Sequence, residues 1–278
     1  MAKFDAYCAT IREVELPNIA ETLAFRMGAH VDHGHVQKRF GQTLQIVKGG
    51  RPFAWVGEHQ SDTDRYCYLE AKGPNTPQLA QSLRFYFPEH SVPRADVAED
   101  FDGEGVYDQL VRVIRHYKGK RVFGKTELPD NLEDGRTYNT GRRGNVAYMR
   151  TYEKGKTAEF KSAGRPNWVR AEAEIRPQYG ADKVAASKMS PLQMLGFSSW
   201  CKAVWEGLLL TDIERFEPEI RESSHEKTQL FIARNYRRFL ETCQEDGIDF
   251  MRTCQEIWSE DDKAAEAWKK QEGERRAG

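Results

Sequence analysis

Long hydrophobic runs and paired cysteines are both missing from this 278-residue sequence. No stretch approaches the roughly 20 apolar residues of a membrane-spanning helix, which excludes a helical membrane protein and a membrane partner. The first residues show no apolar segment followed by a small-residue cleavage site, so we expect no secretory signal and a cytoplasmic location. The five cysteines form no Cys-x-x-Cys pair, which favours reduced thiols over a zinc site or a disulfide framework.

An excess of charge of one sign is missing as well. The 42 basic and 43 acidic residues give a net charge of −1, which neither requires nor excludes nucleic acid, because clustering on one face is what matters. Aromatic residues are plentiful, with 6 Trp, 11 Tyr and 14 Phe, and this content excludes a chain that stays unfolded.

Short β-rich runs alternate with two helical patterns over the first two thirds of the chain. Strands are predicted at 42–47, 53–56, 66–70, 94–98, 136–140, 146–154 and 168–175. Helices are predicted from Thr76 and from about Gly105, with a further short helix around 16–27. Adjacent strands with interspersed helices indicate an α+β fold, a central antiparallel sheet with flanking helices. After Pro177 the patterns at 191–210, 226–244 and 250–270 are helical, so we predict an α+β domain over 1–178 and an α-helical C-terminal region over 179–278.

A basic segment with tyrosines is the first candidate site. Ten basic and four acidic residues lie between Arg136 and Arg176. On a strand over 146–154, Tyr148, Arg150, Tyr152 and Lys154 share one face, because side chains alternate with a period of two. Nearby cations favour the phenolate of a tyrosine, whose unperturbed pKa is about 10, and so suit phosphodiester chemistry. The alternative is a half-exposed strand with amphipathic tyrosines and solvated charges.

Carboxylates on two strands form the second candidate. Arg170, Glu172, Glu174 and Arg176 share one strand face, and Asp96 and Asp100 share another with Arg94. Paired carboxylates can start a site for a hard cation. The alternative is cross-strand salt bridging.

These segments together resemble the replication initiation factor family (Rep_trans) of rolling-circle plasmids and filamentous phages. Residues 94–103 resemble its Arg-x-Asp-x-Ala-x-Asp strand, 137–155 its glycine-basic turn leading to Arg-x-Tyr-x-Lys, and 168–172 its Trp-x-Arg-x-Glu strand. Residues 40–41 and 68–73 also fit its N-terminal hairpins, so the likeness covers about 40–178. The turn at 141–145 lacks the serine common in that family, and Tyr148 adds a second tyrosine.

The resemblance implies a relaxase-like DNA strand-transferase that starts rolling-circle replication by nicking and rejoining one strand. It implies that Tyr152 attacks an origin phosphate and keeps the 5′ end as a phosphotyrosine, with Arg150 and Lys154 offsetting developing charge. Asp96, Glu172 and Glu174 would hold Mg²⁺ or Mn²⁺. The predicted DNA contacts are Arg136, Arg142, Arg143, Arg170 and Arg176.

The predicted partner is origin DNA, single-stranded or in a hairpin, and the resemblance adds a host helicase and polymerase. A DNA-binding phage or plasmid regulator without catalysis is the alternative. Its basic strand face would bind phosphates and its tyrosines would stack on unpaired bases. A third possibility is a structural α+β protein. The sequence does not indicate the oligomeric state.

Overall fold

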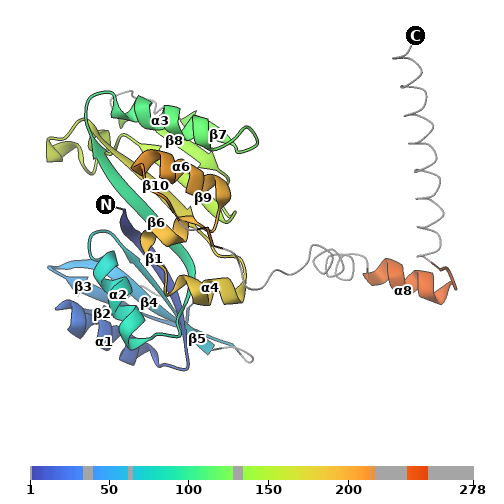
Figure 1. Cartoon of the computed structure of the whole chain (residues 1–278). Helices are drawn as coiled ribbons and strands as arrows, with labels where there is room; N and C mark the ends of the chain where they lie inside the picture. The colour runs from blue at the N-terminus through green and yellow to red at the C-terminus, as the bar shows by residue number, and fades with distance from the viewer. Residues whose placement is uncertain are drawn as a thin grey trace, which may run out of the picture. The chain divides into compact units, whose positions relative to one another are not determined.

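Ten strands of the described chain form one sheet in which every neighbouring pair is antiparallel. The computed structural model describes residues 2–33, 40–61, 65–127, 134–213, 215–216 and 237–249. The strand order is β2-β3-β4-β5-β1-β6-β10-β9-β8-β7. The strands are β1 (Lys3–Arg12), β2 (His30–His33), β3 (Gln42–Lys48), β4 (Arg51–Gln60), β5 (Arg65–Lys72), β6 (Ser91–Asp102), β7 (Gly124–Glu127), β8 (Thr137–Gly141), β9 (Ala147–Tyr152) and β10 (Trp168–Ile175). Figure 1 shows β1 and β6 in the middle, with β2–β5 below them and β7–β10 above.

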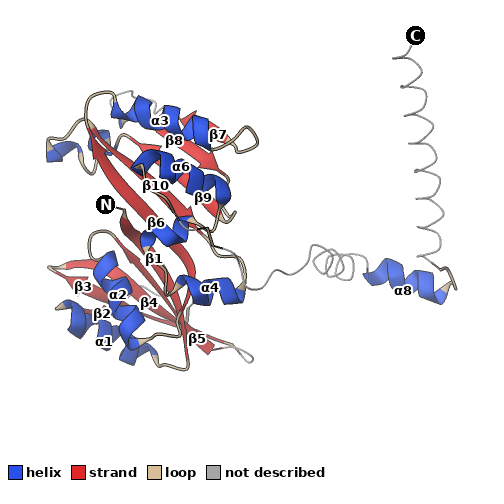
Figure 2. Ribbon diagram, in the orientation of Figure 1, coloured by secondary structure: helices blue, strands red, loops and turns tan. Residues whose placement is uncertain are grey.

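Helices contribute to the same hydrophobic core as the strands. They are α1 (Leu16–Met27), α2 (Thr76–Tyr86), α3 (Val106–Tyr117), α4 (Gly180–Ala186), α5 (Pro191–Leu195) and α6 (Ser199–Leu209), and the C-terminal part contains α8 (Arg237–Glu245) (Figure 2). Two 3₁₀ turns, η2 (Lys154–Lys156) and η3 (Lys161–Ala163), lie between β9 and β10. The predicted α+β class with an antiparallel sheet and flanking helices is confirmed.

Alternate strand positions explain why the helices lie against one face. In β1, Tyr7, Ala9 and Ile11 belong to the same apolar cluster as Leu23 of α1 and Leu83 of α2. The cluster continues through alternate residues of β6, β10 and β9 to Trp205 of α6. Since side chains of a strand alternate between faces, the other face is left for the polar residues of the same strands.

Helix boundaries follow local signals. Helix α1 ends at Gly28, which adopts the left-handed conformation (φ 59°) that glycine takes at little cost. Helix α5 begins with a capping box, in which Ser190 and Gln193 exchange side-chain-to-backbone hydrogen bonds. The chain then breaks at 196–198, so the helix predicted over 191–210 is two helices, α5 and α6.

Three strands are absent from the prediction. These are β1, β2 and β7. Strand β1 is central and buried on both sides, so it has no clear alternation of polar and apolar residues. The strand predicted over 146–154 ends at Tyr152, and Lys154 lies in the turn η2.

Contacts divide the chain into two compact units, Met1–Ile220 and Arg221–Gly278. Helices α4, α5 and α6 belong to the first unit with the sheet, so this division does not coincide with the predicted boundary after residue 178. In the second unit α8 is described and carries Phe239, half exposed. The helix predicted over 226–244 is described only from Arg237, and the one over 250–270 lies outside the described residues.

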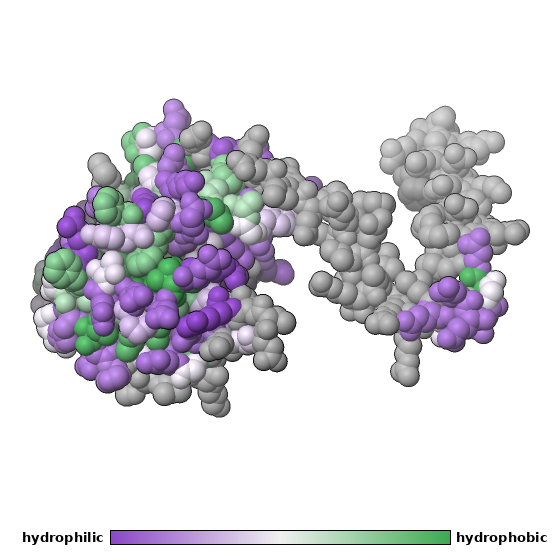
Figure 3. All heavy atoms as spheres, turned by 90° about the horizontal axis from the view of Figure 1, so that it is seen from below, coloured by the Kyte–Doolittle hydropathy of each residue, from purple (hydrophilic) through white to green (hydrophobic). Residues whose placement is uncertain are grey.

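None of the described helices is both long enough and apolar enough to cross a bilayer. In the view of Figure 3, apolar side chains form separate green areas among polar ones.

Candidate active site

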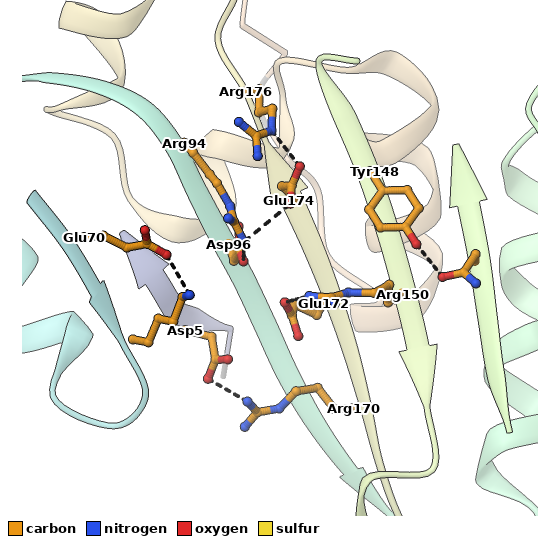
Figure 4. A network of polar contacts seen from close by, with 12 residues as sticks. Asp5, Glu70, Arg94, Asp96, Tyr148, Arg150, Arg170, Glu172, Glu174 and Arg176 are labelled. Carbon is orange, nitrogen blue, oxygen red and sulfur yellow. Dashed lines mark hydrogen bonds and ion pairs between the residues drawn. The ribbon is translucent and has the colours of Figure 1, made fainter. Parts of the chain in front are cut away.

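The face of the sheet opposite the helices is polar and is continuous from β4 to β9. Residues paired across an antiparallel register point to the same face, as do residues two apart in one strand. The register links Trp55 to Glu70, Glu70 to Cys8, Cys8 to Arg94, Asp96 to Glu174, and Arg170 to Tyr152. We call this the polar face; its charged residues and tyrosines are Glu70, Arg94, Asp96, Asp100, Tyr148, Arg150, Tyr152, Arg170, Glu172 and Glu174, and Figure 4 shows most of them.

Tyr152, the predicted nucleophile, is the last residue of β9 and is half-buried on this face. Its register partner is Arg170 on β10, and Arg150 precedes it by two residues. Burial raises the pKa of Tyr152 and the charge of Glu172 raises it further, whereas Arg170 and Arg150 lower it. The phenol is therefore held in its protonated form, close to a carboxylate and two guanidinium groups.

The other two tyrosines of the basic segment differ in their surroundings. Tyr148 is buried, and its hydroxyl donates a hydrogen bond to Asn139 Oδ1 at 2.5 Å. Tyr138 is paired with Thr151, so it faces the helices, where Arg115 lies over its ring. Among these three, Tyr152 is the tyrosine on the polar face that is partly open to solvent.

Each carboxylate predicted as a metal ligand is bound by an arginine. Arg94 binds Asp96 through two hydrogen bonds of 2.8 and 2.5 Å and lies 3.4 Å from Glu174. Glu174 also accepts a hydrogen bond from Arg176 at 2.6 Å, and Glu172 accepts one from Arg150 at 2.5 Å. Cross-strand salt bridging, the alternative given for these carboxylates, is present in Arg150–Glu172 and Arg94–Glu174, and same-strand pairs accompany it.

Glu172 is buried beside two further acids. Burial raises its pKa; Arg150 acts to lower it, while the charges of Asp96 and Asp5 raise it. A carboxylate with a raised pKa is a better proton acceptor than an ordinary one.

Arg170, one of the predicted DNA contacts, is buried and paired with two acids. Its side chain is 6% exposed; it donates hydrogen bonds to both oxygens of Asp100 at 2.7 Å and to Asp5 Oδ1 at 2.6 Å. The indole of Trp168 donates to the same Asp100 at 2.8 Å. Burial acts to raise the pKa of Asp100, but these hydrogen bonds from Arg170 and Trp168 lower it.

Sequence reasoning missed Asp5. The register of β1 against β6 shifts between Phe4 and Ala6, which places Asp5 at an irregularity. Such bulges re-aim side chains next to functional sites. Because β1 itself was not predicted, no sequence signal connected Asp5 with Arg170.

Lys154 lies beyond the end of β9 rather than next to Tyr152 on a strand. Its ammonium group contacts two aromatic rings, at 4.2 Å from the centroid of Phe160 and 4.6 Å from that of Trp168. Gly155 makes this turn possible, because a Cβ there would lie 1.8 Å from the carbonyl oxygen of Arg165. Burial and the charge of Arg170 lower the pKa of Lys154, while Asp100 and Asp5 raise it.

Two of the five predicted DNA contacts are exposed arginines in one turn. Arg142 and Arg143 lie in the turn between β8 and β9, with Arg143 5.3 Å from the ring centroid of Tyr148. Arg136 instead binds Glu153 and Asp108 and lies over the ring of Tyr107. Arg176 binds Glu174.

The predicted metal ligands do not form a metal site in this arrangement. Asp96, Glu172 and Glu174 share the polar face, but guanidinium groups occupy their oxygens. Within the described ranges no three His, Cys, Asp or Glu side chains are placed to hold an ion. The requirement for Mg²⁺ or Mn²⁺ therefore stays a prediction.

The fold is similar to that of a rolling circle replication initiator protein from Geobacillus stearothermophilus, with 17% sequence identity and a TM-score of 0.48. The alignment covers 81% of this chain and 89% of that chain. No protein-family model matches the sequence, and no curated protein matches it significantly. Membership of the replication initiation factor family stays a prediction.

Proposed function

We propose that this protein is a rolling-circle replication initiator that nicks and rejoins one DNA strand through Tyr152. The observation that carries the proposal is the position of Tyr152, half-buried on the polar face between Arg150 and Arg170, with the charge of Glu172 acting on its phenol. The motif resemblance points to the same tyrosine.

The reaction follows from these groups. The Tyr152 oxygen attacks a phosphorus of the bound strand and forms a P–O bond, while the bond from phosphorus to the O3′ oxygen breaks. The phenolic proton passes to Glu172, and the departing O3′ takes up a proton from solvent. The 5′ phosphate remains as a tyrosine ester, which preserves the phosphodiester energy for rejoining.

Positive charge near the phosphate comes from Arg150 in this proposal. Its side chain is 33% exposed and is held by Glu172 alone among the described ion pairs, so it can also reach a phosphate. Arg170 stays fixed between Asp5 and Asp100 and contributes its charge to the site. No step is assigned to a metal ion, because arginines hold the predicted ligands.

One observation favours the second candidate, a DNA-binding protein without catalysis. Burial raises the pKa of Tyr152, which keeps the phenol protonated, and the carboxylates around it are already paired. In that case DNA would bind to the same face without a covalent product.

A covalent-adduct assay tests the proposal. The full chain is incubated with random-sequence single strands and with the supercoiled replicon that carries its gene, each with Mn²⁺ and with EDTA. We expect a protein–DNA adduct that survives SDS, and peptide mapping that places the nucleotide on Tyr152.

Two variants serve as the matched pair. Tyr152→Phe removes one oxygen and should abolish the adduct while DNA binding is kept. Tyr148→Phe also removes one oxygen, on the same strand and face, and should leave the first cleavage intact. Binding without any adduct under all conditions would favour the non-catalytic candidate.

A further inference from the structure

An aromatic cluster lies on the polar face at the opposite end of the sheet from Tyr152. The rings of Phe40, Trp55 and Tyr68 contact one another, with centroid distances of 5.4 Å for Phe40–Trp55, 5.8 Å for Phe40–Tyr68 and 5.5 Å for Trp55–Tyr68. Phe40 is buried, whereas Trp55 and Tyr68 are half-buried and partly open to solvent. Their neighbours Val56 and Leu69 are fully buried on the other face, as strand alternation requires.

Gly57 fits this cluster closely. A Cβ at residue 57 would lie 2.7 Å from Cγ of Phe40, so the absence of a side chain lets the Phe40 ring pack against the strand. Phe40 in turn supports the edge of Trp55, since the two rings meet at 62°. The Trp55 ring is thus held in place before any ligand binds.

A pocket of about 230 Å³ opens beside Trp55. Phe53 and Trp55 line it from β4, Gln45 from β3, and Glu70 and Lys72 from β5. The side chain of Lys72 is 67% exposed and forms an ion pair with Glu70 at 2.7 Å. The pocket therefore combines aromatic rings, a neutral amide and an accessible ammonium group that is paired with a carboxylate.

The pocket is on the same face as Tyr152. Trp55 pairs with Glu70, and the register continues through Cys8 and Arg94 to the carboxylates of β6 and β10. Five strand spacings of about 4.8 Å separate β4 from β9, or roughly 24 Å across the sheet. The registers of Trp55 and Tyr152 meet β6 at Arg94 and Asp100, six residues apart, which adds roughly 20 Å along the strands. A DNA strand with its phosphate at Tyr152 would reach the pocket, roughly 31 Å away, within about nine nucleotides at a 3.4 Å rise.

We propose that this pocket binds one unpaired base of the DNA strand, stacked on Trp55, with the Gln45 amide at the base edge and Lys72 at a neighbouring phosphate. An aromatic ring can stack only on a base whose ring face is not covered by a neighbouring base. In a duplex both faces of a base are covered, so the ligand is single-stranded DNA. The inference rests on the proposed function for the identity of the strand. The pocket can nevertheless be tested without cleavage.

Tryptophan fluorescence measures the stacking directly. Oligothymidylate is titrated into the full chain, and the same titration is made with Trp55→Phe. We expect the oligonucleotide to quench the wild type more than the variant, because only stacked Trp55 loses its emission. An oligomer of abasic deoxyribose phosphates of the same length should bind more weakly and should not produce this difference.

Affinity measurements by anisotropy complete the test. Trp55→Ala should weaken oligothymidylate binding about tenfold, as expected for the loss of one stacked base. Lys72→Ala should lower the salt slope on single strands by about 0.7. Phe85→Ala is the matched control: this ring on α2 is 77% exposed and lies outside the polar face, so affinity should not change.

The outcomes separate this inference from the proposed function. Quenching that is equal in wild type and Trp55→Phe, or unchanged affinity in a folded Trp55→Ala, would overturn the base pocket even if Tyr152 forms an adduct. Conversely, quenching by Trp55 in a protein that forms no adduct would support the pocket and count against the nicking reaction. Tyr152→Phe should keep the full quenching signal.

Discussion

Asp96 and Glu174 are register partners across β6 and β10, and a single guanidinium group, that of Arg94, contacts both carboxylates. Arg176 also pairs with Glu174, so two guanidinium groups balance the two carboxylates. The same strand continues to Glu172, which Arg150 holds. A metal ion bound here has to compete with arginine for its ligands.

This competition makes a prediction for Arg94→Gln. Removing the guanidinium leaves Asp96 without its partner and Glu174 with Arg176 alone, so Mn²⁺ should raise the unfolding temperature of the variant more than that of the wild type. Differential scanning fluorimetry over a Mn²⁺ series measures the difference. Arg176→Gln is the control, because Glu174 keeps Arg94 in that variant. A variant that gains no stabilisation from Mn²⁺ would contradict the predicted ligand set.

Arg170 should contribute strongly to stability. Its side chain is buried between Asp5 and Asp100, so Arg170→Ala removes the guanidinium partner of both acids and should cost about 3–5 kcal/mol of unfolding free energy. Urea denaturation gives the value. Arg165→Ala removes an exposed pair with Asp102 and should cost no more than about 1 kcal/mol. Equal losses of unfolding free energy in the two variants would show that burial does not determine how much each arginine stabilises the fold.

Salt dependence of duplex binding should depend on the turn between β8 and β9. Arg142 and Arg143 are exposed there, so replacing each by alanine should reduce the slope of log K against log salt by about 1. Arg26→Ala, an exposed arginine on α1, should leave the slope unchanged. If neither turn variant changes the slope, DNA phosphates contact another part of the chain.

Glu153 should stabilise the fold above acidic pH. Burial acts to raise its pKa, but hydrogen bonds from Arg136 and Lys156 lower it to about 2. A pKa below the unfolded value gives stability that is present above about pH 4.5 and is lost as pH falls towards 2. Glu153→Gln should therefore be less stable than wild type at pH 7, with the gap closing over that range in urea denaturation. The control is Glu159→Gln, at an exposed residue, which should be as stable as the wild type at pH 7.

The elements that could be predicted are those with a one-sided pattern. Strands β3 to β5 are short β-rich runs. Strand β10 alternates polar and apolar residues, and α3 places Leu110 and Ile114 four residues apart, so these two sequences carry the period of the element. Strand β1 lies in the middle of the sheet and is buried on both sides, which removes the alternation. Its Asp5 was therefore missed.

The contacts within the site depend on the register between neighbouring strands, and this register cannot be derived from a single sequence. The sequence predicts that Glu172 and Glu174 share a face with Arg170, but not that Arg94 of β6 lies within reach of Glu174. The same limit applies to the aromatic cluster. Trp55 and Tyr68 lie in predicted strands, yet only the pairing of β4 with β5 brings them together.

The role of Glu172 gives the last prediction, because two interpretations of its charge predict opposite effects of Glu172→Gln on the rate of adduct formation. Its carboxylate raises the pKa of Tyr152, so Glu172→Gln should make the phenolate form at lower pH. If Glu172 were only an electrostatic neighbour, the variant would form the adduct faster at pH 7. If Glu172 accepts the phenolic proton, the variant should form the adduct about 10²–10⁴-fold more slowly, and this deficit should shrink as pH rises and hydroxide replaces the base.

We expect this slower adduct formation in single-turnover assays between pH 6 and 9. Glu174→Gln, on the same strand and face, should keep the wild-type profile. Circular dichroism and retained DNA binding show that either variant is folded, and a faster Glu172→Gln would exclude the base role.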